Sequence, residues 1–351
     1  MRIVVNDFAA SVGGAISILV SFYNYLISSG DRNEWFFLLS EKYVEETENI
    51  HIVLLSKEKN SRVERLLFDY LYGRRIIERI KPDAVFYLQN TFIHGIEVPQ
   101  IVYMDQSIPF QKTCSFSFFK KEERPYAIYQ HIIGKMIKKT CRVADCIIVQ
   151  TNWMKAAISK QCHVLDRKIN VIPPEISISR PSEEDTSVFE KTKFFYPAGE
   201  MIYKNHRCIV EALKLITMEI EVSFTISPKD KYKGDKRIRC IGSLSHEEVI
   251  KRLSHQTLVF PSYIETYGLP LAEARQLGTI VLAADTEFAR EVLYGYPNAF
   301  FFDPFNPREL SSLMMRVAEG SIIPKQTDMN MTTKEKGWSK VVECILEFGR
   351  N

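Results

Sequence analysis

The chain has 351 residues, of which 46% are hydrophobic and 25% are charged, and its formal net charge is +3. This composition is typical of globular proteins and excludes a fibrous, collagenous or small disulfide-stapled protein. Because a domain usually holds about 100–200 residues, the length predicts two domains.

The first elements follow the order strand, glycine loop, helix, which opens a doubly wound α/β domain. Arg2–Asn6 is a short apolar strand, Gly13 and Gly14 lie in the loop, and an apolar helix is expected over about 15–29. This stretch is long and uncharged, but its glycines and serines favour a buried helix over a membrane span or a signal peptide.

Short β-branched or aromatic runs continue this alternation through the first half. They predict a parallel sheet whose sites lie at the carboxyl ends of the strands. Helices are expected over 63–80 and 126–143, and strands at 35–39, 51–55, 84–88, 100–103 and 146–150.

The distribution of charge and the number of cysteines indicate the binding partners and the redox compartment of the protein. Residues 1–180 hold 24 Lys/Arg against 19 Asp/Glu, and the remainder holds 22 against 24. A modestly basic first half favours an anionic membrane surface or substrate, and we expect no nucleic-acid partner. The seven cysteines form no CxxC pair, which predicts reduced thiols of a cytosolic protein, mostly in the core, and no structural zinc.

The alternation stops near residue 171 and restarts about twenty residues later. Two prolines and the polar segment 181–185 mark a linker between domains of residues 1–175 and 190–332. Two such domains in series predict a ligand in the cleft between them. In the second domain we expect strands at 193–196, 220–226, 237–241, 257–260, 279–283 and 300–302, and helices at 205–218, 246–254, 270–277 and 307–319. A last helix is expected within 333–351, packed either on the second domain or, by crossing back, on the first.

Several motifs that carry chemistry are absent from the sequence. There is no GxGxxG after a strand, no GxxxxGK[ST], no GxSxG and no HExxH. Asp-x-Asp is absent too, so a carboxylate pair that would clamp a metal-diphosphate has no evident source. We therefore expect neither a metal nor a cofactor.

The densest candidate site runs from residue 260 to residue 274. A buried strand leads through a turn at Gly268 into a helix with Pro270 in its first turn, where proline wastes no backbone donor. The backbone N–H groups of Tyr267, Gly268 and Leu269 are free at this helix start, which is a natural site for an anion or a hydroxyl.

Two carboxylates flank that helix start. Glu265 precedes the turn and Glu273 lies about one helical turn inside, so both can face one ligand. An acidic residue at the second position commonly receives ribose hydroxyls. The alternative is a solvated pair that complements the helix dipole. Glu-x7-Glu spacing occurs elsewhere in the chain, so the information lies in the turn between the two carboxylates.

This segment resembles the donor-sugar signature of the retaining glycosyltransferases of family 4. The sequence segments 283–292, 299–304 and 307–310 occur in the same order as similar segments in the C-terminal half of that family. Lys204 follows Tyr-Pro-Ala-Gly, where the family has its phosphate-binding lysine. The resemblance implies a GT-B fold, α/β, with two Rossmann-like doubly wound domains facing each other across a cleft.

The resemblance also implies roles for individual residues. Glu265 would bind hydroxyls of the transferred sugar, the amides of Tyr267–Leu269 would contact the same sugar, and Glu273 would bind the ribose. Lys204 would neutralise the leaving diphosphate in place of a metal. Catalysis would then be mostly positioning and electrostatic stabilisation.

Glycines and one carboxylate of the first half complete the expected site. Gly13 and Gly14 would let the backbone approach the diphosphate or the acceptor, or they form only a tight turn. Asp105 follows the strand expected at 100–103, where many relatives have His-Asp, and it aligns with either member of that pair. It is read as a catalytic position or as a satisfied carboxylate at a strand end.

The sequence departs from the family at a second place. The family usually has an arginine about five residues before the lysine, but Gly199-Glu200 occupies that region, and Arg207 or another base is a possible substitute. No histidine is assigned a role, and His206 is the only histidine that the sequence places beside a candidate site.

A basic, aromatic stretch overlaps the helix expected over 126–143. Residues 111–140 hold seven Lys/Arg and two Glu, with Phe118 and Phe119 beside Lys120 and Lys121, and residues 57–81 are basic as well. Such a surface suits an anionic membrane, although a solvated face is the alternative.

The function implied is transfer of a sugar, with retention, from a nucleotide-sugar donor to a saccharide or lipid-linked saccharide. The expected setting is bacterial surface polysaccharide synthesis, either in the cytoplasm or at the inner face of the cell membrane. The rival readings are a nucleotide-sugar epimerase of the same fold and an inactive GT-B scaffold subunit.

Overall fold

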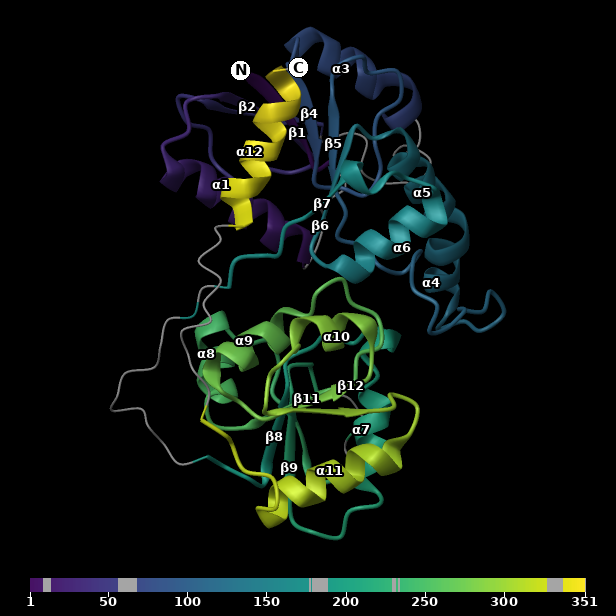
Figure 1. Ribbon diagram of the computed structural model, residues 1–351, viewed down its shortest axis with the longest axis vertical. Helices are drawn as coiled ribbons and strands as arrows, with labels where there is room; N and C mark the ends of the chain where they lie inside the picture. The colour runs from purple at the N-terminus through teal and green to yellow at the C-terminus, as the bar shows by residue number, and fades with distance from the viewer. Residues whose placement is uncertain are drawn as a thin grey trace. The chain divides into compact units, whose positions relative to one another are not determined.

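A computed structural model describes residues 1–8, 14–55, 68–176, 178, 189–228, 232, 234–326 and 337–350. The chain divides into two compact units (Figure 1). The first unit holds residues 1–119, 124–175 and 335–351, and the second holds 120–123 and 176–334. The polar segment 181–185, expected as part of the linker, lies outside the described residues.

The first unit contains a parallel sheet of seven strands in the order β3-β2-β1-β4-β5-β6-β7. The order reverses direction between β1 and β4, as in doubly wound folds. The strands are β1 (Arg2–Asn6), β2 (Glu34–Leu39), β3 (Ile50–Leu54), β4 (Ala84–Tyr87), β5 (Gln100–Tyr103), β6 (Cys146–Val149) and β7 (Ile169–Val171).

Helices cover both faces of this sheet because its strands are apolar on both sides. Ile3 and Val5 of β1 pack into one hydrophobic cluster and Val4 packs into the other, which follows from the alternation of side chains along a strand. One face carries α1 (Gly14–Ser29) and α12 (Gly337–Arg350), and the other carries α3 (Gly73–Ile80), α5 (Gly134–Val143) and α6 (Asn152–Cys162).

The remaining helical segments of the first unit are short. The helix expected over 126–143 is built from α4 (Arg124–Ile128), a π-helical turn η2 (Tyr129–Ile133) and α5. The helix expected over 63–80 is described only from residue 68, as η1 (Phe68–Tyr72) and α3. A short turn η3 (Asp166–Lys168) precedes β7.

The last helix of the chain, α12, belongs to the first unit. Trp338 packs against Phe22 of α1 and Tyr103 of β5, with ring centroids 5.0 and 5.5 Å apart, and its indole donates to Ser21. Val341 and Ile345 are buried in the same cluster. The first sheet is therefore completed by residues from both ends of the chain.

The second unit contains a parallel sheet of six strands in the order β10-β9-β8-β11-β12-β13. Its order reverses between β8 and β11, which repeats the plan of the first sheet. The strands are β8 (Lys193–Tyr196), β9 (Glu221–Phe224), β10 (Ile238–Cys240), β11 (Thr257–Phe260), β12 (Val281–Ala284) and β13 (Ala299–Phe302).

The helices of the second unit form two groups. One is α7 (His206–Leu213) with α11 (Pro307–Glu319), and the other is α8 (His246–Leu253), α9 (Leu269–Leu277) and α10 (Glu287–Val292). Right-handed crossovers explain the division, because connections that run in opposite directions along the sheet place their helices on opposite faces. The doubly wound α/β architecture expected from the sequence is confirmed in both units.

Among the described residues, the structure also tests the expectations of reduced cysteines and of a buried first helix in place of a membrane span. All seven cysteines are free thiols, and four of them are buried, namely Cys141, Cys146, Cys162 and Cys208. In the part of the chain that the structure describes, no helix is long and apolar enough to cross a membrane. Instead, α1 packs its apolar side chains on the first sheet.

Candidate functional site

The loop that follows β8 places Lys204 at the reversal of strand order in the second sheet. A single helical turn, η5 (Ile202–Lys204), ends at Asn205, which adopts a left-handed conformation with φ of +56°. The Tyr196 hydroxyl donates to the carbonyl of Lys204 at 2.7 Å. Burial raises the pKa of that hydroxyl, so it stays protonated and continues to donate.

Asn205 joins this loop to two others. Its amide nitrogen donates to the carbonyls of Pro261, at 3.3 Å, and Pro304, at 2.8 Å. The loops after β8, β11 and β13 are thereby tied together at the carboxyl edge of the sheet. Asparagine suits this place because it tolerates a positive φ better than most residues and brings two donors.

The loop that follows β11 carries the motif read in the sequence. Gly268 has a φ of +86°, which favours glycine, and it forms the N-terminal boundary of α9 with Pro270 in the first turn. The backbone N–H groups of Tyr267–Leu269 therefore lie at the start of a helix of nine residues, as the sequence indicates.

Glu265 and Lys204, 61 positions apart in the sequence, contact each other in the second unit. The Lys204 Nζ lies 2.5 Å from Glu265 Oε1, and the two side chains are only 15% and 16% exposed. The Ser262 hydroxyl, which is fully buried, donates to the same Oε1 at 2.7 Å. A cation, a carboxylate and a buried donor thus form one cluster where ligands bind in doubly wound folds.

Glu273 has a partner of its own. It lies buried in α9, and its Oε1 is 2.8 Å from Nε2 of His246, the first residue of α8. A capping box between Ser245 and Glu248 fixes the start of α8 and so places the imidazole. A histidine therefore belongs to the neighbourhood of the candidate site, although the sequence alone assigns none.

In the first unit, Asp105 lies two residues beyond β5. Its Oδ1 accepts a hydrogen bond from the Asn90 amide at 2.6 Å, and its backbone N–H donates back to Asn90 at 3.1 Å. Burial raises the pKa of Asp105 to about 6, although the bond from Asn90 lowers it. Gly14 begins α1, whereas Gly13 lies outside the described residues.

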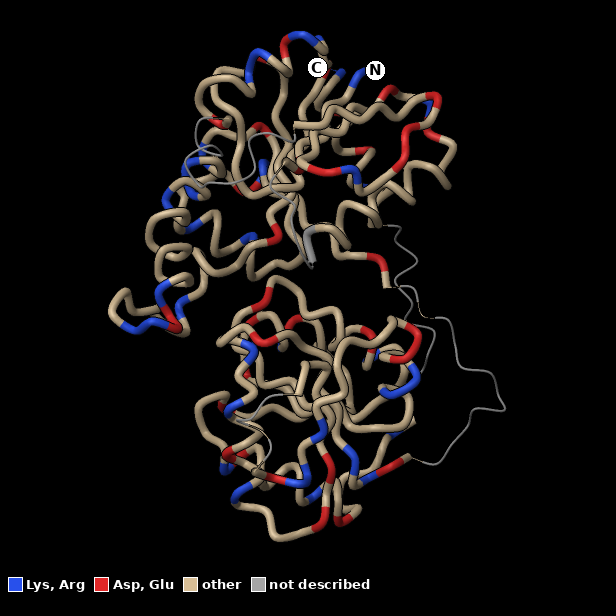
Figure 2. Tube along the Cα trace, turned by 180° about the vertical axis from the view of Figure 1, so that it is seen from behind, with Lys and Arg blue, Asp and Glu red and all other residues tan. Residues whose placement is uncertain are grey.

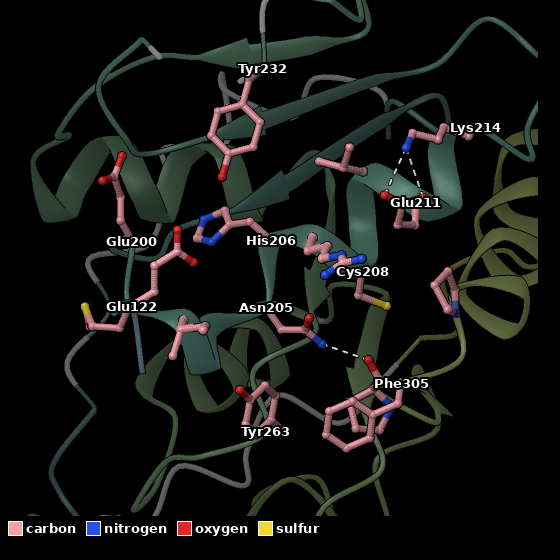
Figure 3. A pocket seen from close by; sticks show the side chains of 16 residues that line it. Glu122, Glu200, Asn205, His206, Cys208, Glu211, Lys214, Tyr232, Tyr263 and Phe305 are labelled. Carbon is pink, nitrogen blue, oxygen red and sulfur yellow. Dashed lines mark hydrogen bonds and ion pairs between the residues drawn. The ribbon is translucent and has the colours of Figure 1, made fainter. Parts of the chain in front are cut away.

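A hollow adjoins the Lys204 loop on the α7 side of the second unit (Figure 3). Asn205, Tyr263 and Phe305 line it, and Arg207 lines it as well. The Tyr263 and Phe305 rings lie 5.3 Å apart. Lys204 and Glu265 are not among the lining residues, so the structure places Arg207 at this hollow and not in the Lys204–Glu265 contact.

Potential metal ligands are dispersed. Within the described ranges, no group of three or more His, Cys, Asp or Glu side chains could hold a metal ion. The charged cluster of the second unit contains one cation and one carboxylate, which suits an anionic or hydroxyl-bearing ligand better than a metal.

Comparison with known proteins identifies the family that the second half of the chain resembles. Residues 182–336 match the family model described as Glycosyl transferases group 1. The second unit is a group 1 glycosyltransferase domain. No curated protein sequence matches the chain closely enough to serve as a relative.

Solved structures extend the likeness to the entire GT-B fold. HepE of Anabaena in complex with UDP-glucose is 13% identical with a TM-score of 0.63, covering 100% of this chain and 97% of that chain. WaaG, a glycosyltransferase involved in lipopolysaccharide biosynthesis, is 12% identical with a TM-score of 0.67 over 98% and 99% of the chains. The lipopolysaccharide outer core galactosyltransferase WaaB is 15% identical with a TM-score of 0.62 over 99% of both. Over its whole length the chain therefore has the GT-B fold, and residues 182–336 carry the group 1 glycosyltransferase domain.

The sequence identified both members of the central contact but not the residues that hold them. Ser262, Asn205 and His246 are absent from the expected site, although Ser262 and Asn205 stand within the segments that carry the resemblance. The position of His246 at the start of the helix after β10, at the ligand-binding edge of the sheet, is the signal that could have identified it.

Proposed function

We propose that the enzyme transfers a sugar, with retention, from a nucleoside diphosphate sugar to a saccharide or lipid-linked saccharide, without a metal. The contact of Lys204 with Glu265 at the reversal of strand order carries this proposal. It offers a cation for a diphosphate and, beside it, a carboxylate for sugar hydroxyls and developing positive charge. HepE, a neighbour in fold, is crystallised with UDP-glucose, which supports a nucleotide-sugar donor.

The remaining residues take supporting roles in this proposal. Glu273 receives the ribose hydroxyls, and the N–H groups of residues 267–269 contact the transferred sugar at the start of α9. Asp105, with its raised pKa, is the catalytic candidate of the first unit, as an acceptor of hydroxyl hydrogens.

A thermal-shift panel of UDP, GDP, ADP and TDP tests the donor class. The nucleotide that binds specifically should raise the melting temperature by mass action, and its sugar conjugate should raise it too. Transfer to an acceptor is then measured with the matching nucleotide sugar. Turnover of donor without any acceptor would indicate an epimerase, and binding without transfer would indicate a scaffold subunit.

We propose further that the enzyme acts at the cytoplasmic face of a membrane in surface polysaccharide synthesis. Phe119 is 95% exposed, and exposed Lys135, Lys139 and Arg142 share one face of α5 at helical spacing. Figure 2 shows Lys and Arg along the side of the first unit that carries α3 and α5. Bases near anionic headgroups contribute about 1 kcal/mol each, and an exposed aromatic side chain inserts at the interface.

Vesicle pelleting tests the membrane contact. The enzyme should pellet with vesicles of anionic phospholipid, less so at high salt, and Lys135→Glu/Lys139→Glu should reduce the pelleted fraction several-fold. Lys236→Glu, at an exposed lysine of the second unit, is the control. Equal pelleting with neutral and anionic vesicles, or none with either, contradicts the proposal.

A further inference from the structure

Both hydrogen bonds that described residues make to the Glu265 side chain end on the same oxygen. Lys204 Nζ and Ser262 Oγ lie 2.5 and 2.7 Å from Oε1. The second oxygen of the carboxylate is therefore the one that remains for a sugar hydroxyl. Both donors hold the carboxylate at Oε1, which fixes the direction in which Oε2 can accept a hydrogen bond from a ligand.

The same geometry ties the charge of Lys204 to that of Glu265. Because both side chains are largely shielded from water, the carboxylate lowers the positive potential at the ammonium more strongly than an exposed pair would. A diphosphate that binds Lys204 has to compete with Glu265 for that charge. Glu265 thus opposes binding of the very group that Lys204 attracts.

Contacts other than the Lys204 side chain position Ser262, whose hydroxyl also lies 3.3 Å from the carbonyl of Tyr203 and 3.4 Å from that of Ile264. Ser262 is fully buried, and the next residue, Tyr263, donates its backbone N–H to the carbonyl of Tyr203 at 3.1 Å. The hydroxyl has one hydrogen, and its shortest contact is the bond to Glu265. When the ammonium moves toward a phosphate, the bond from Ser262 can persist.

We propose that Glu265 and the donor's diphosphate share Lys204, and that Ser262 is the positioning residue that keeps Glu265 aimed at the sugar during this exchange. The inference rests on the proposed function. According to this proposal, the Lys204–Glu265 contact lowers the affinity of the enzyme for the diphosphate. The same contact orients the Glu265 carboxylate for the transfer step.

Binding and turnover of matched variants test this proposal. Calorimetric titration with inorganic pyrophosphate and with UDP, GDP, ADP and TDP measures affinity. Glu265→Gln should bind the same anion about three- to ten-fold more tightly than the native enzyme, because Lys204 loses its competing charge. Transfer by that variant should fall at least about 100-fold, since the carboxylate acts on the transition state.

Ser262→Ala should change binding in the opposite direction. Without the hydroxyl, Oε1 depends on Lys204 alone, so anion affinity should fall about two- to five-fold while kcat falls more than donor KM changes. In the Glu265→Gln background the same substitution should leave affinity unchanged, because Ser262 acts through Glu265.

Two controls separate these effects from misfolding. Glu319→Gln removes an exposed carboxylate at the end of α11, and Ser311→Ala removes a buried hydroxyl that bonds Arg308. Both should leave affinity and transfer unchanged, and thermal melting of every variant should report an intact fold.

The outcomes distinguish the two proposals. If the native enzyme binds neither pyrophosphate nor any of the nucleotides, the proposed function fails and this inference fails with it. If the native enzyme binds but Glu265→Gln binds equally or more weakly, the shared ammonium is wrong while the proposed function stands. If Ser262→Ala acts equally in both backgrounds, Ser262 is not a positioning residue for Glu265.

Discussion

The two units share one sheet plan but differ at the point where the strand order reverses. In the second unit, the loops after β8 and β11 are joined by the Lys204–Glu265 contact and by the Asn205 amide. In the first unit, the described residues at the corresponding edge contain the neutral–acid pair of Asn90 and Asp105. The same sheet plan therefore carries a cation–carboxylate contact between loops in the second unit and an amide–carboxylic acid pair among the described loop residues of the first, because loops vary more than the sheet that carries them.

The two units also differ in which parts of the chain complete them. The first unit takes in α12 from the far end of the chain, whose Trp338 packs on α1 and β5. The second unit is continuous in sequence apart from the four residues 120–123. The first unit thus depends on residues more than 300 positions apart, and the second depends mainly on its own loops.

The largest expected effect concerns the charged site of the second unit. Lys204→Ala should lower transfer by about 100- to 1,000-fold, because the leaving diphosphate loses its cation. Steady-state kinetics with the nucleotide sugar found by the binding panel measures this. Lys236→Ala, at an exposed lysine before β10, should leave the rate unchanged. Equal rates for Lys204→Ala and the native enzyme would remove the functional distinction between the two units.

The next effect concerns how the first unit is closed. Trp338→Ala should lower the free energy of unfolding of the first unit by about 2–3 kcal/mol, through lost packing on Phe22 and Tyr103. Urea denaturation followed by hydrogen exchange should assign the loss to the first unit only. Trp338→Phe should recover part of it, and an equal loss in the second unit would show that the units do not unfold separately.

Asp105 gives the first unit a pH dependence of its own. Because its pKa is raised to about 6, the folded state holds the proton to a higher pH than the unfolded state does. Its contribution to stability therefore falls as pH rises from about 4 to about 6 and stays unfavourable above that range. Asp105→Asn should be about 1–3 kcal/mol more stable than the native enzyme at pH 7 and equal to it below about pH 4.

Asp285 of the second unit is the matched control. Its hydrogen bond with Arg290 lowers its pKa, so Asp285→Asn should act in the opposite direction and remove stability at pH 7. The loss should be small because the pair is about half exposed. Chemical denaturation across pH 3–8 compares the two variants. A stability difference for Asp105→Asn that does not change with pH would contradict the raised pKa.

The smallest effect concerns His246. His246→Ala should weaken nucleoside diphosphate binding by about two- to five-fold, because Glu273 loses the partner that orients it toward the ribose. Affinity for inorganic pyrophosphate, which has no ribose, should remain unchanged. An equal loss for both ligands would place the effect of His246 on the diphosphate and not on the ribose.

The sequence by itself determined the fold class, the approximate strands and the segment that carries the site. These follow from local information: apolar runs of strand length, a glycine that adopts a positive φ and a proline in the first turn of a helix. The same local sequence identified Glu265, Lys204 and Glu273. The family model confirms that the segment around them resembles glycosyltransferases. Their individual roles remain predictions.

Only the tertiary structure decided which side chains touch. Lys204 and Glu265 meet because β8 and β11 are neighbours in the sheet, although β9 and β10 lie between them in the sequence. His246 contacts Glu273 because α8 packs beside α9. The helix α12 covers the first sheet because its apolar face packs against α1 and β5. Contacts of this kind depend on strand order and helix packing, which arise from burial over the entire unit and leave no local mark in the sequence.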